Sequence, residues 1–219
     1  MNLERKIMDT TLKYSKLPMR PFRHEQHVTI GQGVSIWPRV SIGSHTYING
    51  GVIRSDVSIG RFCSISYGVS IGFGNHAMGV LTTSPFGSRC AWDRSHVSPY
   101  KNGRAIRDET EIGHDVWIGL NVVISKGVRV GSGSIIGAGA IVTKDIPPYS
   151  VVIGSPPHVV RRRFPDDVCD ALIKSEWWTL PPDVIQKLPV NNIKACVVAI
   201  EAMIDVPRLA WGEHFTLLN

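Results

Sequence analysis

Residues 112–142 read IGHDVWIGLNVVISKGVRVGSGSIIGAGAIV, and an aliphatic residue stands at every sixth position of this stretch. The same spacing runs through much of the chain upstream, with one five-residue step and one long interruption. Fifteen positions keep it, and all are isoleucine or valine: Ile30, Ile36, Ile42, Ile48, Ile53, Ile59, Ile65, Ile71, Ile106, Ile112, Ile118, Ile124, Val130, Ile136 and Val142. A strict period of this kind predicts a repeat architecture.

The residues between the repeat positions indicate which repeat it is. Four places after each aliphatic residue stands a smaller one, mostly valine, and glycine often follows the aliphatic residue directly. Residues four and two apart point the same way from an extended segment, and glycine permits the bend into the next strand. One hexad cannot bury its inward side chains, but stacked coils about 4.8 Å apart can. A β-sandwich would space its turns at about 8–12 residues instead.

Composition and charge limit the class of protein and its possible partners. The 219 residues are 43% hydrophobic and 19% charged, which argues against a disordered chain, and eight of the 21 glycines directly follow a repeat aliphatic residue. The net charge of +6 suits an anionic ligand as well as nucleic acid. The four cysteines form no CxxC pair, so neither a zinc ribbon nor a disulfide framework is expected. No signal peptide or membrane span is recognisable, and we expect a cytoplasmic protein without a membrane or nucleic-acid partner.

The tandem [LIV]-G-x-x-[V/S/T/A]-x hexads resemble the left-handed parallel β-helix acetyltransferases, also called hexapeptide-repeat acetyltransferases. The resemblance implies an all-β solenoid in which three hexads make one triangular turn, so that fifteen hexads make five turns, and it implies a homotrimer. We expect an N-terminal arm or capping helix at 1–27 and the β-helix domain at 28–163, with an extruded loop at about 72–105. A C-terminal helical segment is expected at 164–219, with Asp166 as a helix N-cap.

The loop carries the candidate catalytic residue. Within it, Gly74-Asn75-His76 and the following Thr82-Thr83-Ser84-Pro85-Phe86 resemble the xenobiotic (streptogramin and chloramphenicol) acetyltransferase branch. The resemblance implies that His76 is the general base at a boundary between subunits. The chemistry asks for such a residue, because a hydroxyl that attacks a thioester must lose its proton and imidazole titrates near neutral pH.

The second run of hexads resembles the coenzyme A-binding edge of the wider family, through DVWIG and IGAGAIVTKDIPPYS. By that resemblance Trp117 lines the groove, the backbone near Gly119 and Ala138 hydrogen-bonds the pantetheine, and Thr143 and Lys144 face the phosphates. Small residues also let a ligand approach the backbone closely. Lys126 and Arg129 are further cations along this run. The alternative is that glycine and alanine occur here only because a tight coil requires small residues.

The family usually closes with a basic residue after Gly-x-Pro, where this chain has His158 in Gly154-Ser155-Pro156-Pro157-His158. The triplet Arg161-Arg162-Arg163 just beyond is a candidate substitute. It is also the most nucleic-acid-like feature of the chain, but no nucleic-acid module accompanies it. Trp177 and Trp178, which the xenobiotic branch also carries, are expected to pack against the prism.

These features predict an acetyl-CoA-dependent acetyltransferase that acts on a small-molecule hydroxyl, without a metal. The acceptor is either an antibiotic, such as streptogramin A or chloramphenicol, or a cell-envelope sugar or nucleotide sugar acetylated on oxygen or nitrogen. A sugar acceptor is favoured because the first hexads continue without the longer segment that is typical of the antibiotic-modifying members. Trp37 and Tyr47 replace small coil residues and are candidates to face an acceptor, and a plain surface role is the alternative. A zinc-dependent hydratase and a non-catalytic scaffold are the other classes, although no two histidines are spaced by five as in the related carbonic anhydrases.

Overall fold

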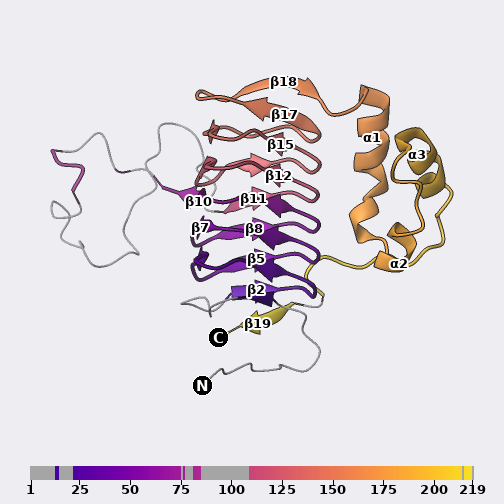
Figure 1. Ribbon diagram of the computed structural model, residues 1–219, viewed down its shortest axis with the longest axis horizontal. Helices are drawn as coiled ribbons and strands as arrows, with labels where there is room; N and C mark the ends of the chain where they lie inside the picture. The colour runs from indigo at the N-terminus through magenta and orange to yellow at the C-terminus, as the bar shows by residue number, and fades with distance from the viewer. Residues whose placement is uncertain are drawn as a thin grey trace.

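A computed structural model describes residues 22–74, 76, 81–84, 109–213 and 215–218, together with the backbone of 13–14. Short strands wind into a three-sided prism whose long axis runs vertically in Figure 1. Each side is one sheet, and strands on each side pair in parallel with those one turn away. The predicted parallel β-helix with a C-terminal helical segment is confirmed. Most of the loop predicted at about 72–105 lies outside the described residues.

We call the three sides faces A, B and C. Face A contains β1 (Lys13–Tyr14), β3 (Thr29–Ile30), β6 (Tyr47–Ile48), β9 (Ser64–Ile65), β12 (Trp117–Ile118), β15 (Ile135–Ile136), β17 (Ser150–Ile153) and β18 (His158–Arg162). Face B contains β2 (Phe22–His24), β5 (Val40–Ile42), β8 (Val57–Ile59), β11 (Thr110–Ile112), β14 (Arg129–Val130) and β19 (Thr216–Leu218). Face C contains β4 (Ser35–Ile36), β7 (Gly51–Ile53), β10 (Val69–Phe73), β13 (Val123–Ser125) and β16 (Ile141–Val142).

The repeat isoleucines and valines stack in register inside the prism, apart from Ile106, which lies outside the described residues. On face A, Ile30 pairs with Ile48, Ile48 with Ile65 and Ile118 with Ile136. These side chains are almost completely buried in one continuous core. Burying a side chain of this size contributes roughly 1.5–3 kcal/mol, so each turn is stabilised chiefly by its inward aliphatic residues.

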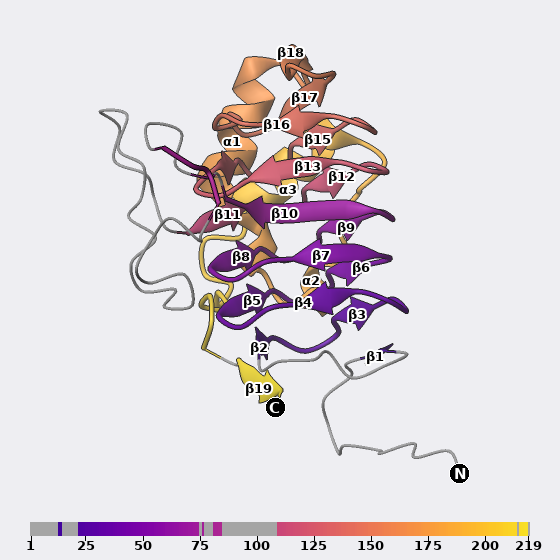
Figure 2. The same cartoon turned by 90° about the vertical axis from the view of Figure 1, so that its left-hand side faces the viewer.

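The long interruption does not break the coil. β10 on face C is the last strand before it and β11 on face B is the first after it. β11 pairs directly with β8, and β13 pairs directly with β10, so the chain re-enters one turn above the place it left. The excursion therefore replaces one corner between faces C and B, from the arrowhead end of β10 (Figure 2).

The prism begins earlier than the sequence predicted. β2 pairs in parallel with β5, so the coil starts at Phe22 rather than at position 28. The coil continues beyond the last strand of face C, with β17 on face A and a bridge between Val130 and Ile146 on face B. These begin a further turn, one more than the five predicted. At the N-terminal side, Lys13–Tyr14 is a strand that pairs with β3 rather than part of a capping helix.

The C-terminal segment packs against the corner where face B turns into face A. It contains α1 (Asp166–Ser175), the 3-10 turn Trp177–Thr179, α2 (Pro182–Ile185) and α3 (Ile193–Glu201). Their apolar side chains form a second core that includes Tyr149 of the prism. Asp166 is the first helical residue rather than the N-cap, which is Pro165. In Figure 1 the helices lie on the opposite side of the prism from the end of β10.

After α3 the chain returns to the bottom of the prism. Its last strand, β19, pairs antiparallel with β2, the first strand of face B (Figure 1). The C-terminal end therefore covers an edge that would otherwise expose unpaired backbone groups. Among the described residues no helix has the length and apolar composition needed to cross a bilayer.

Candidate active site

His76 is exposed, three residues beyond the end of β10. Its Nδ1 lies 2.9 Å from the carbonyl oxygen of Thr83, within the predicted TTSPF motif. A carbonyl oxygen only accepts, so Nδ1 carries the proton, and in the neutral ring Nε2 keeps its lone pair free. This contact gives the imidazole the tautomer that a general base needs. Asn75 and the Pro85-Phe86 end of the motif lie outside the described residues.

The point where the chain leaves the prism is held by several contacts. Gly72 has φ +83°, a conformation that L side chains rarely adopt, and the pairing of β10 with β13 shifts by one residue between Ile71 and Phe73. The Phe73 carbonyl accepts a hydrogen bond of 2.8 Å from the amide of Lys126, one turn above. The path of the backbone toward His76 is therefore set by glycine, a bulge and one cross-turn hydrogen bond.

Trp117 lies on face A, where its cross-strand neighbours are Ser64 and Ile135. Its side chain is 55% exposed, which is unusual for an indole and leaves it available to a ligand or to a second subunit. A cavity of about 240 Å³ opens beside it, lined by Phe62, Ser64, Asp115, Val116, Trp117, Ile135 and Arg163. His76 does not line this cavity, so Trp117 and His76 of one chain do not share it.

Gly119 and Ala138 are neighbours one turn apart, at the corner between faces A and C. A Cβ at Gly119 would lie 2.7 Å from the amide nitrogen of Ala138, too close for any side chain. The Gly119 amide already donates to the carbonyl of Ile136 at 2.8 Å, so it is not free for a pantetheine oxygen. Ala138 itself is exposed. The glycine thus permits the tight stacking, and Ala138 is the one of the two that a ligand can reach.

Thr143 and Lys144 are exposed at the other end of β16, where face C turns into face B. They share this corner with the end of β10 and are separated from Gly119 and Ala138 by the width of face C. Arg129, which the sequence placed with them, is engaged elsewhere: its guanidinium lies 2.8 Å from the carboxylate of Glu111. The Asp145 side chain accepts from the Arg129 amide at 2.9 Å.

The arginine triplet after His158 is divided among three environments. Arg163 turns inward, 2.8 Å from Asp115 and 2.7 Å from the carbonyl of Gly133. Arg162 pairs with Asp166 and Asp170 of α1. Arg161 is exposed, and its Nη1 donates to the carbonyl of Arg162. Burial raises the pKa of Asp115, and Arg163 offsets only part of that rise.

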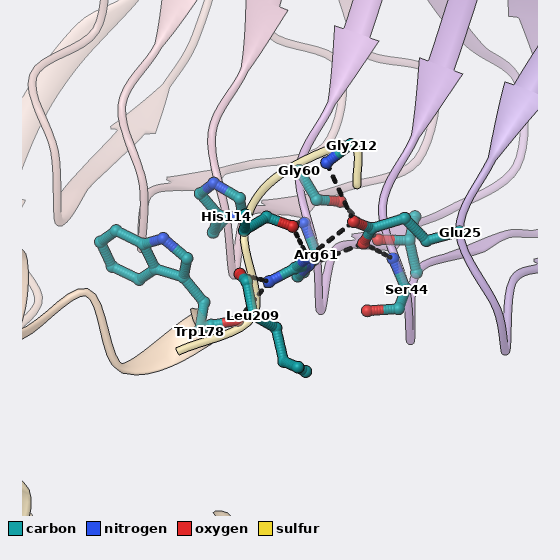
Figure 3. Close-up of polar contacts among 10 residues, drawn as sticks. Glu25, Ser44, Gly60, Arg61, His114, Trp178, Leu209 and Gly212 are labelled. Carbon is teal, nitrogen blue, oxygen red and sulfur yellow. Dashed lines mark hydrogen bonds and ion pairs between the residues drawn. The ribbon is translucent and has the colours of Figure 1, made fainter. Parts of the chain in front are cut away.

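The region with the most buried polar contacts was not foreseen. Arg61 and Glu25 form a buried ion pair at 2.6 Å (Figure 3), and Arg61 also donates to carbonyls of Trp178, Leu209 and Ala210. The guanidinium therefore ties the prism to the C-terminal tail. No sequence pattern indicated it, because opposite charges 36 residues apart carry no local signal.

His114 lies beside this ion pair. Its Nδ1 accepts from the Arg61 amide at 3.0 Å, and its ring stacks on Trp178 with centroids 4.9 Å apart. Burial, with a smaller effect of Arg61, lowers the pKa of His114 to about 4. For Glu25, burial raises the pKa, but hydrogen bonds from Arg61 and Ser44 outweigh it and lower the pKa overall. Trp178 packs against the prism as the sequence predicted.

No group of three or more His, Cys, Asp or Glu side chains that could hold a metal ion is found in the described ranges. His24 and His27, three positions apart in the sequence, do not face a common site: His24 is buried and donates to the carbonyl of Glu25, whereas His27 is exposed and stacks on His45. The cysteines at 63, 169 and 196 are buried and free.

Comparisons with known proteins agree with this geometry. A family model described as bacterial transferase hexapeptide (six repeats) matches residues 109–144. A probable macrolide acetyltransferase of Lysinibacillus sphaericus is 42% identical over 129 residues, which are 58% of this chain and 71% of that protein. A chloramphenicol acetyltransferase of Agrobacterium fabrum is 37% identical over 57% of this chain and 60% of its own length.

A virginiamycin A acetyltransferase of Staphylococcus aureus is 40% identical over 138 residues, which are 62% of each chain. The matched part of this chain therefore spans less than two thirds of the chloramphenicol and virginiamycin relatives. The sequence similarity leaves more than a third of this chain unmatched in each case.

Proposed function

The chain belongs to the hexapeptide-repeat acetyltransferases, and on that premise we propose that it transfers acetyl from acetyl-CoA to a hydroxyl of a small molecule. His76 is the general base of this proposal. The observation that carries it is the contact between His76 Nδ1 and the Thr83 carbonyl, which in the neutral ring leaves the Nε2 lone pair available on an exposed segment beside face C.

In the proposed reaction the acceptor hydroxyl gives its proton to Nε2 of His76 while its oxygen attacks the thioester carbonyl. A carbon–oxygen bond forms, the carbon–sulfur bond breaks, and the proton passes from the imidazolium to the departing thiolate. His76 holds that proton between the two steps, and no other group of the chain needs to change its charge.

Acetyl-CoA is the second substrate of the proposal. Ala138 offers a close approach to the backbone, Trp117 offers an exposed indole, and Thr143 and Lys144 offer a hydroxyl and a cation for phosphate. Gly119 contributes by letting the two turns stack closely. His158 and Arg161 are exposed and available for the remaining coenzyme contact, whereas Arg162 and Arg163 are engaged in ion pairs.

The acceptor is proposed to be an antibiotic of the kinds that the relatives' names carry, or a sugar. The sugar is favoured by the unbroken run of short strands from β2 to β10, which has no inserted segment before the loop. Antibiotic acceptors are favoured by the macrolide, chloramphenicol and virginiamycin relatives.

A thiol-release assay tests the reaction. Purified protein and acetyl-CoA are incubated with virginiamycin M, chloramphenicol, and amino- and hydroxy-sugars in turn, and free coenzyme A is measured. For the best acceptor, His76→Ala is expected to lower kcat by about 100- to 10,000-fold. His27→Ala is the control, because His27 is also exposed but lies at another corner. Full activity of His76→Ala would contradict the mechanism.

We also propose that the protein is a homotrimer whose sites lie between subunits. Support comes from the separation between the segment carrying His76 and the cavity at Trp117 within one chain. Mixing His76→Ala and Trp117→Ala subunits after dissociation tests this. If one subunit supplies His76 and its neighbour Trp117, about a quarter of the sites in an equal mixture regain both residues. Rates are compared at acetyl-CoA concentrations well below KM, where Trp117→Ala is slowed, and activity no higher than the mean of the two variants would argue against shared sites.

A further inference from the structure

One cation at the corner between faces C and B is held in an unusual way. Trp37 follows β4, Arg54 follows β7 and Phe73 ends β10, so the three belong to successive turns. The Arg54 Cζ lies 4.1 Å from the centroid of the Trp37 ring and 5.1 Å from that of the Phe73 ring. We call these residues the Arg54 cluster. Contact with two rings orients the guanidinium and lowers the entropy that it loses on binding.

The donors of this guanidinium have no acceptor in the part of the chain that the structure describes. Its backbone amide is paired with Ile71, but no described residue accepts a hydrogen bond from the side chain or forms an ion pair with it. Arg39 and Arg163 differ, since Arg39 pairs with Asp56 and Arg163 pairs with Asp115, whereas Arg23 of β2 contacts only one ring, that of Phe215, and likewise has no described acceptor. A half-buried guanidinium that contacts two rings and has no acceptor among the described residues is suited to a carboxylate or a phosphate, which it binds with two parallel hydrogen bonds.

The position of the cluster relates it to the proposed site. His76 is three residues beyond Phe73, which limits their Cα separation to about 10 Å. Thr143 follows β16, two strands above β10 on the same face, or roughly 10 Å away along the prism. The chain leaves the prism toward His76 at the end of β10. The residues proposed to hold the coenzyme phosphates lie above this point, and the Arg54 cluster extends below it. We take this as the side from which the acceptor approaches.

We propose that Arg54 binds a carboxylate or phosphate of the acceptor, so that the substrate class is an acidic or phosphorylated hydroxy-compound such as a sugar acid or a sugar phosphate. This inference rests on the proposed function, since it assigns a substrate class to the site of His76. Trp37 and Phe73 are positioning residues that hold the guanidinium, and Arg54 is the residue that determines specificity.

Equilibrium binding tests the assignment without relying on turnover. Galactose, galacturonate and galactose 1-phosphate are titrated calorimetrically into the protein with coenzyme A present. The two anionic sugars separate a carboxylate from a phosphate preference. At least one is expected to bind about tenfold or more tightly than galactose, and Arg54→Gln is expected to abolish the difference. Arg54→Lys keeps the charge but loses the paired donors, so it should restore the difference only in part.

The matched control is Arg39→Gln, which removes a cation from the same corner that is already paired with Asp56. It should leave the preference for anionic sugars intact, and melting temperatures of all variants report whether they fold. If neither anionic sugar binds wild type more tightly than Arg54→Gln, the proposal is wrong.

Thiol release gives an independent readout. Arg54→Gln should raise KM for anionic acceptors while leaving neutral acceptors nearly unaffected. An equal loss with charged and neutral acceptors would mean that Arg54 only supports the segment bearing His76, and would overturn the assignment. If no acceptor yields free thiol, the proposed function fails, but the binding comparison between wild type and Arg54→Gln still decides the anion site.

Discussion

Arg61 and Glu25 meet inside the molecule as a two-pronged ion pair, with Nε to Oε2 and Nη2 to Oε1 both at 2.6 Å. Both side chains are only 4% exposed. The remaining Arg61 donors reach carbonyls of Trp178, Leu209 and Ala210, and Gly212 donates to Glu25. The pair thus joins two turns of the prism to a tail more than a hundred residues away (Figure 3).

Removing one partner should destabilise the protein strongly. Arg61→Met leaves the Glu25 carboxylate buried without its counter-charge, and we expect a loss of about 3–5 kcal/mol in the free energy of unfolding. Denaturant unfolding measures it. Arg39→Gln breaks an exposed pair and should cost no more than about 1 kcal/mol. A loss for Arg61→Met as small as that of Arg39→Gln would show that the pair does not hold the tail.

His114 should make stability depend on pH in the weakly acidic range. Its pKa is lowered from 6.5 to about 4 in the folded protein, so the unfolded chain binds the proton first. The contribution of this group to the free energy of unfolding is fully present above about pH 6.5. It is lost as the pH falls toward 4, and the loss is at most roughly 3 kcal/mol. Melting temperatures from pH 7 to 4 measure it. In His114→Asn, whose amide does not titrate, this part of the pH dependence should disappear.

Glu25 should add a second loss at lower pH. Its pKa is lowered below 4.5 in the folded protein, so the stability it contributes is present above pH 4.5 and is lost as pH falls through the folded value. Acid unfolding followed by circular dichroism is expected to shift to higher pH in Ser44→Pro, which removes an amide donor to Glu25. Because proline also alters the backbone, Ser41→Pro on the neighbouring strand β5 serves for comparison. An equal shift in both would not support a role of Glu25.

Gly119 should tolerate no side chain. In Gly119→Ala the new Cβ would meet the backbone of Ala138 at 2.7 Å, which neither turn can relieve without moving, and we expect a loss of about 1–3 kcal/mol. Gly137→Ala is the matched control, since its Cβ would meet the Ile153 side chain at 2.9 Å and no backbone atom closer than the Val152 carbonyl oxygen at 3.3 Å. Thermal melting of both variants makes the comparison. Equal effects would show that backbone crowding is not the cause.

Trp117 should matter for the coenzyme and little for stability. Its side chain is 55% exposed, so Trp117→Ala is expected to lower the melting temperature only slightly while raising KM for acetyl-CoA several-fold. Leu217→Ala removes an equally exposed apolar side chain at the bottom of the prism and should leave KM unchanged. An unchanged KM in Trp117→Ala would remove Trp117 from the proposed groove.

The sequence predicted the coil well because the period is a direct consequence of burial. Each inward position, such as Ile118 or Ile124, must be aliphatic to fill the same narrow core, and that requirement repeats with every strand. The bounds were less accurate. β2 was missed because His24 takes the place of the repeat isoleucine, although it is equally buried.

The candidate site was predicted from motifs rather than from period. His76 and Trp117 were named by resemblance, and their roles remain predictions that the variants above test. Arg54 was not singled out, although with hindsight a signal existed. Trp37 precedes it by 17 positions, the spacing of one turn, as Arg39 precedes Asp56.

The sequence by itself therefore determined the coil, since an aliphatic residue every six positions can be buried only by stacking turns. Tertiary structure alone decided which outward side chains meet. Outward-facing side chains do not have to fill the core, so their sequence pattern does not reveal which residues they contact. Arg61 finds Glu25 two turns below it and Leu209 in the returning tail, and Arg54 lies between two rings with its donors turned to no described residue.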